Sequence, residues 1–182
     1  MKFQFACVLA LLLPSLASAG ERTSLPAGTF TLDAYAAYAD DLEASDYHMP
    51  AVAVGANWYA FDDVSFGLEL GGVGFYGGAG DDATAVNLSG VFRVHFIDTP
   101  KYTVYFDALF GPTYASAEVP GGGTNSNFLS RFGIGGTLPI RQNLDLMGGV
   151  RFFHLSNANI HGEDQNPAIN GVQYYVGVMW RF

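Results

Sequence analysis

The sequence predicts an all-β fold: an eight-stranded antiparallel transmembrane β-barrel of the outer-membrane type, with a polar, packed interior. Aromatic and β-branched runs recur along the chain, apolar and polar residues alternate within them, and the connections alternate between short and long. The composition is 49% hydrophobic and 15% aromatic, yet no window beyond the first residues has the roughly 18 consecutive apolar residues of a membrane helix. Any insertion into a membrane must therefore be by strands.

The strand-forming runs are separated by clusters of Gly, Asp, Asn and Pro, which are typical of turns. Each run has the about 9 to 11 residues that a tilted strand needs to cross a bilayer. The expected strands are 28–39, 49–60, 64–76, 84–97, 101–115, 127–140, 143–156 and 170–182.

The connections between these strands form two classes. Those at 62–63, 98–100 and 141–142 are short, and those at 40–48, 77–83, 116–126 and 157–169 are long. Outer-membrane barrels have this pattern of tight periplasmic turns and longer external loops. An even number of strands then places both ends of the barrel chain on the periplasmic side.

Residue parity assigns the two faces of the barrel, because successive side chains in a strand point to opposite sides. Even positions are mostly apolar and would face lipid. Odd positions include four acids and four arginines: Asp33, Glu69, Asp107, Asp145, Arg93, Arg131, Arg151 and Arg181. Equal numbers allow ion pairing inside a narrow lumen. A soluble lipocalin-like barrel would show the opposite arrangement.

Residues 1–19 read as a secretory signal peptide, with Lys2, an apolar run and the small-residue site Ala17-Ser18-Ala19. Cleavage there would leave residues 20–182 as one outer-membrane barrel domain. The single cysteine, Cys7, lies within the signal, which excludes disulfide, zinc-thiolate and cysteine-nucleophile chemistry in the mature chain. The net charge of -9, without a basic patch, argues against nucleic-acid binding.

The candidate site is a pair of polar residues on the lipid-facing side of the seventh strand. His154 and Ser156 share the outward even parity and lie about 7 Å apart along the strand. A serine hydroxyl is a weak nucleophile until a neighbouring imidazole takes its proton. Oxyanion donors could come from Asn157 or from backbone N–H groups where the strand ends at Ala158. Asn170, outward on the last strand, could orient the imidazole.

The segment from His154 to Ala158, followed by residues 166–170, resembles the lipid A 3-O-deacylase (PagL) family, most specifically over residues 150–182. The resemblance implies a serine esterase in the outer membrane of a Gram-negative bacterium. Its substrate would be lipid A of outer-leaflet lipopolysaccharide, from which it removes the ester-linked 3-hydroxyacyl chain at position 3. His154 would be the base, Ser156 the nucleophile and Asn157 part of the oxyanion site, with no cofactor.

The chain departs from the family pattern at two positions. The third catalytic residue in relatives is a Glu, which aligns with Asn170, and the Gly that closes the first motif is Asn159. An Asn can orient a His, and Glu163 or Asp164 in the preceding loop are alternatives. The missing Glu also leaves open a non-catalytic small outer-membrane barrel of the adhesin or structural type. His161 with these two acids is too weak a pattern to predict a metal site.

Overall fold

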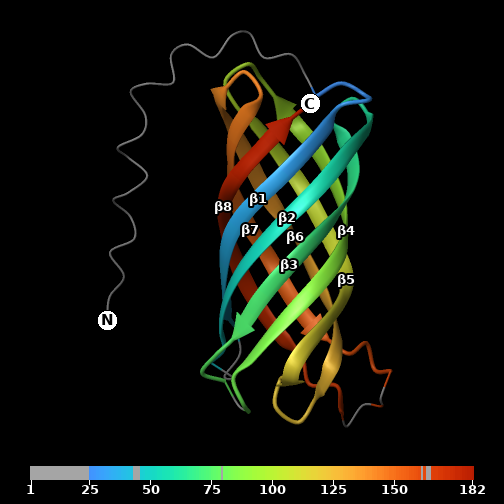
Figure 1. Ribbon diagram of the computed structural model, residues 1–182, viewed down its shortest axis with the longest axis vertical. Helices are drawn as coiled ribbons and strands as arrows, with labels where there is room; N and C mark the ends of the chain where they lie inside the picture. Colours follow the sequence, from blue (N-terminus) through green and yellow to red (C-terminus); the bar gives the residue numbers. More distant parts are fainter. Residues whose placement is uncertain (1–24, 43–45, 79, 161, 163–164) are drawn as a thin grey trace, which may run out of the picture.

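The computed structural model describes residues 25–42, 46–78, 80–160, 162 and 165–182, so the predicted signal peptide lies outside the described residues. Over this part of the chain, eight antiparallel strands follow one another around a closed barrel, with β8 pairing back onto β1 (Figure 1). The strands are β1 Phe30–Asp41, β2 His48–Phe61, β3 Val64–Phe75, β4 Ala83–Asp98, β5 Thr103–Val119, β6 Thr124–Arg141, β7 Leu144–Ser156 and β8 Ile169–Arg181.

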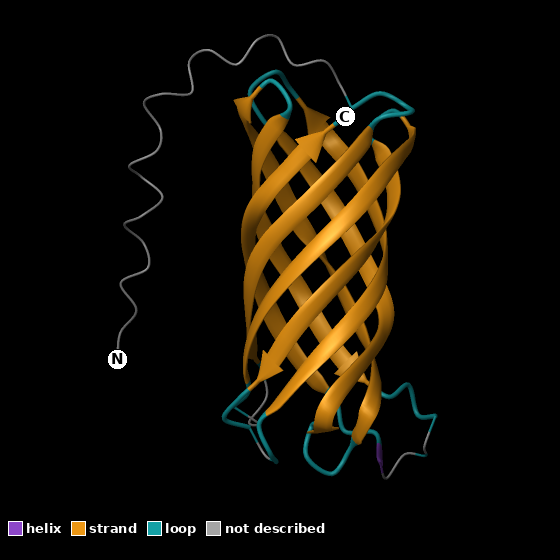
Figure 2. Cartoon of the chain, in the orientation of Figure 1, coloured by secondary structure: helices purple, strands orange, loops and turns teal. Residues whose placement is uncertain are grey.

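The longer connections gather at one end of the barrel and the tight turns at the other (Figure 2). We call these the loop end and the turn end. The C-terminus lies at the turn end (Figure 1). Among the described residues there is no helix long and apolar enough to cross a membrane.

One predicted connection is wrong. The sequence predicts a long loop at residues 116–126, but β5 continues to Val119 and β6 begins at Thr124. The alternation of buried and exposed residues persists through this extension, with Ser116 and Glu118 outside and Val119 inside. Because its outer side is polar, the hairpin lacks the apolar alternation by which the strands were recognised.

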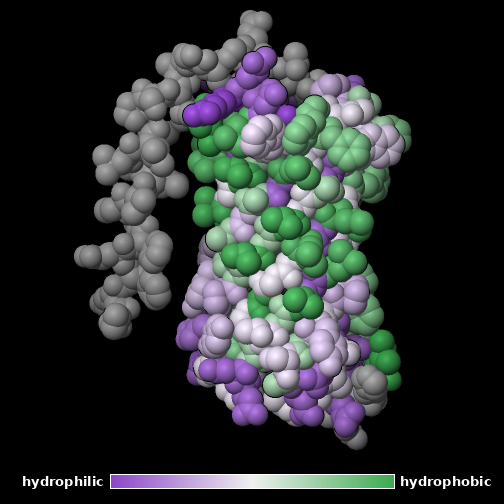
Figure 3. All heavy atoms as spheres, viewed as in Figure 1, coloured by the Kyte–Doolittle hydropathy of each residue, from purple (hydrophilic) through white to green (hydrophobic). Residues whose placement is uncertain are grey.

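The predicted faces of the barrel wall are confirmed. Odd positions are buried inside and even positions are exposed, as Glu69 at 3% exposure and Leu70 at 57% illustrate. Hydrophobic side chains gather on the middle of the wall (Figure 3). Irregular pairing between Tyr59 and Phe61 and between His95 and Ile97 shifts the parity near the turn end, so that Phe61 and Ile97 are exposed.

The predicted ion pairs are present in the lumen. The Arg151–Asp107, Arg131–Glu69 and Arg93–Asp33 pairs have N···O distances of 2.7, 2.8 and 2.9 Å, and Arg181 lies 3.5 Å from Asp145. These side chains are buried in the middle of the barrel or toward its turn end, except that of Arg181, which is partly exposed.

The interior near the loop end is apolar, whereas the sequence predicts a polar interior. A buried cluster there includes Tyr47, Met49, Phe75, Phe153 and Leu155. Phe153 and Leu155 belong to β7 and are at most 1% exposed. They anchor the last residues of β7 against the core. This packing fixes the positions of His154, which lies between them, and of Ser156, which follows Leu155.

Candidate active site

His154 and Ser156 lie at the loop end of β7 and point away from the lumen. Both are partly exposed, whereas Phe153 and Leu155 beside them are buried. The last residues of β7 pair with β6 on one side and with β8 on the other. The two polar side chains therefore lie on the outer wall, on a strand held by β6, by β8 and by the core on its inner side.

Two hydrogen bonds join three side chains into a relay. His154 Nδ1 lies 2.7 Å from Asn170 Oδ1, and His154 Nε2 lies 3.0 Å from Ser156 Oγ. An amide oxygen can only accept, so Nδ1 carries the proton and Nε2 is the acceptor for the Ser156 hydroxyl. This is the tautomer in which an imidazole can take a proton from serine.

The strand register explains why Asn170 is in reach. His154 and Asn170 are directly opposite each other in the β7–β8 ladder. Such pairs have Cβ atoms about 4.5–5.5 Å apart on the same face of the sheet. The structure therefore brings together three of the sequence-predicted site residues, His154, Ser156 and Asn170. The alternatives Glu163 and Asp164 lie outside the described residues.

Asn157 occupies a different position from the other site residues. Its side chain is 2% exposed and binds the loop that follows: Oδ1 accepts from the Asn159 N–H at 2.9 Å, and Nδ2 donates to the Gln165 carbonyl. Its backbone N–H donates to Asn166 Oδ1 at 2.9 Å. Asn157 thus ties the loop to the end of β7, and one of its two amide protons is used in doing so.

The chain leaves β7 through a tight turn. The Ile160 N–H donates to the Asn157 carbonyl at 3.2 Å, and the central residues Ala158 and Asn159 have φ of 54° and 62°. Two positive φ angles define a type I′ turn. Glycine adopts this conformation freely and asparagine tolerates it, whereas alanine is strained in it.

A groove of about 500 Å³ begins beside the relay on the outer wall. It is bordered by Asn157 and Ile160 at one end and by Phe128, Pro112, Leu88 and Leu70 along its length. Phe128 is directly opposite Ser156 in the β6–β7 ladder and opposite Pro112 in the β5–β6 ladder. We call this the upper groove, where upper means nearer the loop end of the barrel, which is at the bottom of Figure 1. The sequence did not reveal it, because it depends on the register between strands.

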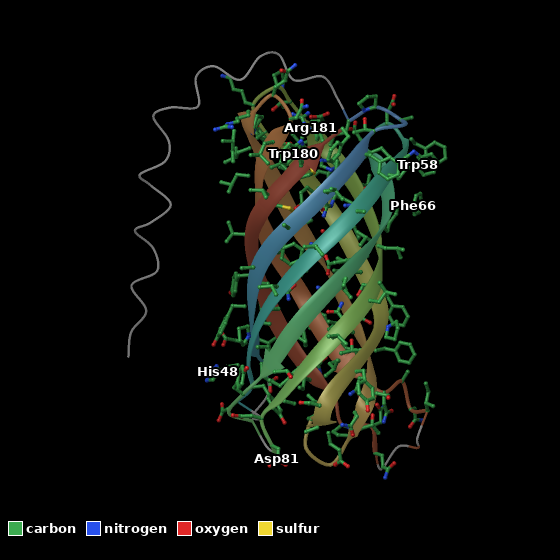
Figure 4. The ribbon with its side chains drawn as sticks, in the orientation of Figure 1. His48, Trp58, Phe66, Asp81, Trp180 and Arg181 are labelled. Atoms are coloured by element: carbon green, nitrogen blue, oxygen red, sulfur yellow. The ribbon has the colours of Figure 1, made fainter. Side chains whose placement is uncertain are left out.

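Among the described residues, the two other histidines lie away from this site. His95 is buried in the lumen, and its Nε2 lies 3.0 Å from the Tyr59 hydroxyl, so it is an interior hydrogen-bonding partner. His48 lies at the loop end with Asp81 (Figure 4). Within the described residues there is no group of three or more His, Cys, Asp or Glu side chains that could hold a metal ion.

Residues 45–179 match the lipid A 3-O-deacylase (PagL) family. The chain belongs to this family. A search of curated proteins finds no match. The matched range contains the relay and the type I′ turn, and the positive φ of Asn159 explains how Asn can stand where the family pattern has Gly.

Solved outer-membrane barrels share the fold. The outer membrane enzyme PagL is 19% identical, with 82% of this chain and 98% of that chain covered and a TM-score of 0.58. Neisserial surface protein A is 17% identical, with 85% and 96% covered and a TM-score of 0.58. OprG from Pseudomonas aeruginosa is 13% identical, with 86% and 97% covered and a TM-score of 0.57. The predicted family, fold and location in the Gram-negative outer membrane are thus confirmed.

Proposed function

We propose that this PagL-family chain is a serine esterase that hydrolyses the ester-linked 3-hydroxyacyl chain at position 3 of lipid A. The observation that supports this most directly is the Ser156–His154–Asn170 relay on the lipid-facing wall. A water-soluble ester would reach this position poorly, whereas a lipid of the outer leaflet already lies against it. Polar groups on such a surface are costly and usually functional.

The reaction begins when Ser156 Oγ attacks the acyl carbonyl carbon while its proton moves to His154 Nε2. The resulting imidazolium is stabilised by the bond from Nδ1 to Asn170 Oδ1. As the tetrahedral intermediate collapses, the bond to the sugar oxygen breaks and His154 returns the proton to that oxygen. An acyl-enzyme on Ser156 remains.

Water completes the cycle. His154 takes a proton from the attacking water, the acyl–Oγ bond breaks, and Ser156 regains its proton as the 3-hydroxy fatty acid leaves. The developing oxyanion needs N–H donors. We assign this role to the second Nδ2 proton of Asn157, together with the backbone N–H at Ala158. The upper groove, which starts at the residue opposite Ser156, would hold the scissile acyl chain.

Mass spectrometry of lipid A tests the proposal. A Gram-negative host expressing the native chain should lose one 3-hydroxyacyl chain from lipid A, and a host expressing Ser156→Ala should not. Ser116→Ala, an exposed serine near the tip of the β5–β6 hairpin, is the matched control and should behave as the native chain. Identical spectra for native and Ser156→Ala proteins, both shown to be folded in the membrane, would instead favour the non-catalytic barrel.

A further inference from the structure

Ser130 is a polar residue on the outer wall that the proposed mechanism does not use. It lies on β6 directly opposite His154, which is in turn directly opposite Asn170 on β8. Three polar side chains therefore form one row across three neighbouring strands of the lipid-facing surface. A hydroxyl at a lipid-facing position is costly without a polar partner, and a polar atom of a bound lipid would supply one for Ser130.

Ser130 also stands at the head of a second groove, of about 630 Å³, which we call the lower groove. Four aromatic side chains, Phe66, Phe92, Phe110 and Phe132, border it, and the small residues Gly90 and Ala108 leave it open. Two rows of directly opposed residues build it. One row is Ser130, Phe110 and Gly90, and the other is Phe132, Ala108, Phe92 and Phe66.

The lower groove leads from the relay into the membrane. Its head lies opposite His154, near the loop end of β7, whereas Phe66 lies near the turn end with Trp58 and Trp180 (Figure 4). Crossing from β6 to β3 takes three strand spacings, or about 14 Å. Because the strands of such barrels are tilted by about 35–45°, this path descends about 8–10 Å, well into one leaflet of the about 30 Å hydrocarbon core.

The two grooves begin side by side. Phe128, at the head of the upper groove, and Ser130, at the head of the lower groove, are two residues apart on β6 and so about 7 Å apart. Ser156 lies opposite the first and His154 opposite the second. A molecule with two acyl chains on neighbouring carbons of one sugar could enter both grooves while its ester lies at Ser156.

We propose that the lower groove holds a second acyl chain of the same lipid, one that is not cleaved, and that the Ser130 hydroxyl hydrogen-bonds to a polar group near the head of that chain. This inference rests on the proposed function and narrows its substrate to lipids with adjacent acyl chains. Both chains are surrounded by lipid whether bound or free, so the groove gives little hydrophobic gain. Its contribution is to orient the ester at Ser156.

Turnover of two matched substrates tests this inference on the refolded full chain in micelles. One is a glucosamine with a long amide-linked chain at position 2 and an ester-linked chain at position 3, and the other has an acetyl group at position 2. Ala108→Leu fills the lower groove, Ser130→Ala removes the hydroxyl, and Ala34→Leu places the same bulk on the exposed face of β1 as a control. The native chain should prefer the two-chain substrate.

We expect Ala108→Leu to lower kcat/KM on the two-chain substrate about tenfold, a typical effect of changed pocket volume. Ser130→Ala should lower it several-fold on both substrates, because the acetyl group keeps the amide at the head of the chain, whereas Ala108→Leu should leave turnover of the one-chain substrate unchanged. Equal losses on both substrates for Ala108→Leu, or no loss on the two-chain substrate for either variant, would overturn the inference. Ala34→Leu should leave both rates unchanged.

A binding measurement separates failure of this inference from failure of the proposed function. The Ser156→Ala protein is irradiated with the two-chain lipid carrying a diazirine on its amide-linked chain, and the cross-links are mapped by mass spectrometry. Cross-links concentrated at Phe92, Phe110 and Phe132 support the inference even if the native chain proves inactive. Cross-links spread evenly around the barrel would show bulk lipid only and would refute it.

Discussion

His154 and Asn170 face each other across the β7–β8 ladder, with Nδ1 2.7 Å from Oδ1. The amide oxygen holds the imidazole in the tautomer that can accept the Ser156 proton. It carries only a partial negative charge, so it stabilises the imidazolium less than a carboxylate does. The relay is therefore geometrically complete and electrostatically weaker than one ending in an acid.

Asn170→Asp should increase turnover. The substitution is nearly isosteric, so the contact with Nδ1 is kept while a full negative charge faces the imidazolium formed in the transition state. We expect kcat to rise about tenfold, and Asn170→Ala to lower it about 10- to 100-fold, within the range of positioned acid–base groups. Single-turnover deacylation in micelles gives the rate of the chemical step for each variant and for the native chain. If Asn170→Asp is no faster than native and Asn170→Ala is no slower, Asn170 has no part in the relay.

Glu163→Gln and Asp164→Asn, made singly and together, should leave turnover within about twofold of native. The contact from Asn170 already occupies the Nδ1 side of the ring, so no loop carboxylate is needed there. The same deacylation assay applies, with Asn170→Ala as the sensitive reference. A tenfold loss in the double variant would assign the orienting role to the loop.

The sequence predicted the barrel wall well, because parity is a local property of each strand. Leu70 outside and Glu69 inside follow from alternation alone, and so does the shared face of His154, Ser156 and Asn170. The parity of burial shifts where the ladder is irregular, as at Phe61. At Glu118 burial still alternates, but the outer side of the strand is polar, so the apolar pattern that reveals a strand is lost.

Features that depend on register could not be predicted. The shared parity of His154 and Asn170 is enough to suggest a contact between them. The grooves, in contrast, depend on register, because they form only where Phe128 lies opposite Ser156 and Ala108 lies opposite Phe132. The outward parity of Ser130 within the expected strand 127–140 was visible in the sequence. Its position beside His154 was not, since it arises only from the β6–β7 pairing.

Ala158→Gly should stabilise the protein. Ala158 has φ of 54° in the type I′ turn, where a Cβ costs about 1–2 kcal/mol, and the greater freedom of glycine when unfolded offsets about 0.5–1 kcal/mol of this. The expected net gain is about 0.5–1 kcal/mol in the free energy of unfolding, measured by urea titration in micelles. Ala56→Gly, in the middle of β2, should destabilise by a similar amount. A loss at both positions would contradict the prediction.

Arg131→Met should strongly destabilise the barrel. Arg131 lies 2.8 Å from Glu69, both side chains are buried, and removal of the guanidinium leaves a carboxylate without its counter-charge. Breaking a buried pair in this way costs about 3–5 kcal/mol. The Tyr35 hydroxyl, which donates to Glu69 at 2.6 Å, remains as a partner. Adding Glu69→Gln to Arg131→Met should recover part of the loss, and additive losses in this double-mutant cycle would argue against coupling.

Asp63→Asn should stabilise the protein at neutral pH more than at acidic pH. Asp63 lies in the tight turn between β2 and β3, where burial, followed by the negative charge of Asp98, raises the pKa of its carboxyl above the ordinary value. A raised folded-state pKa means that the folded state binds the proton more tightly, so this carboxyl's stabilising contribution is greatest below the unfolded-state pKa and falls as pH rises through the folded-state pKa.

Asparagine is neutral, as the protonated carboxyl of Asp63 is, and it tolerates the φ of 63° at this position. The melting temperature of Asp63→Asn in micelles should therefore match native near pH 3, below the ordinary pKa of an aspartate, and exceed it at pH 7. Asp81→Asn, at an exposed loop, removes the same charge without this environment, and an equal rise in that variant would attribute the effect to net charge.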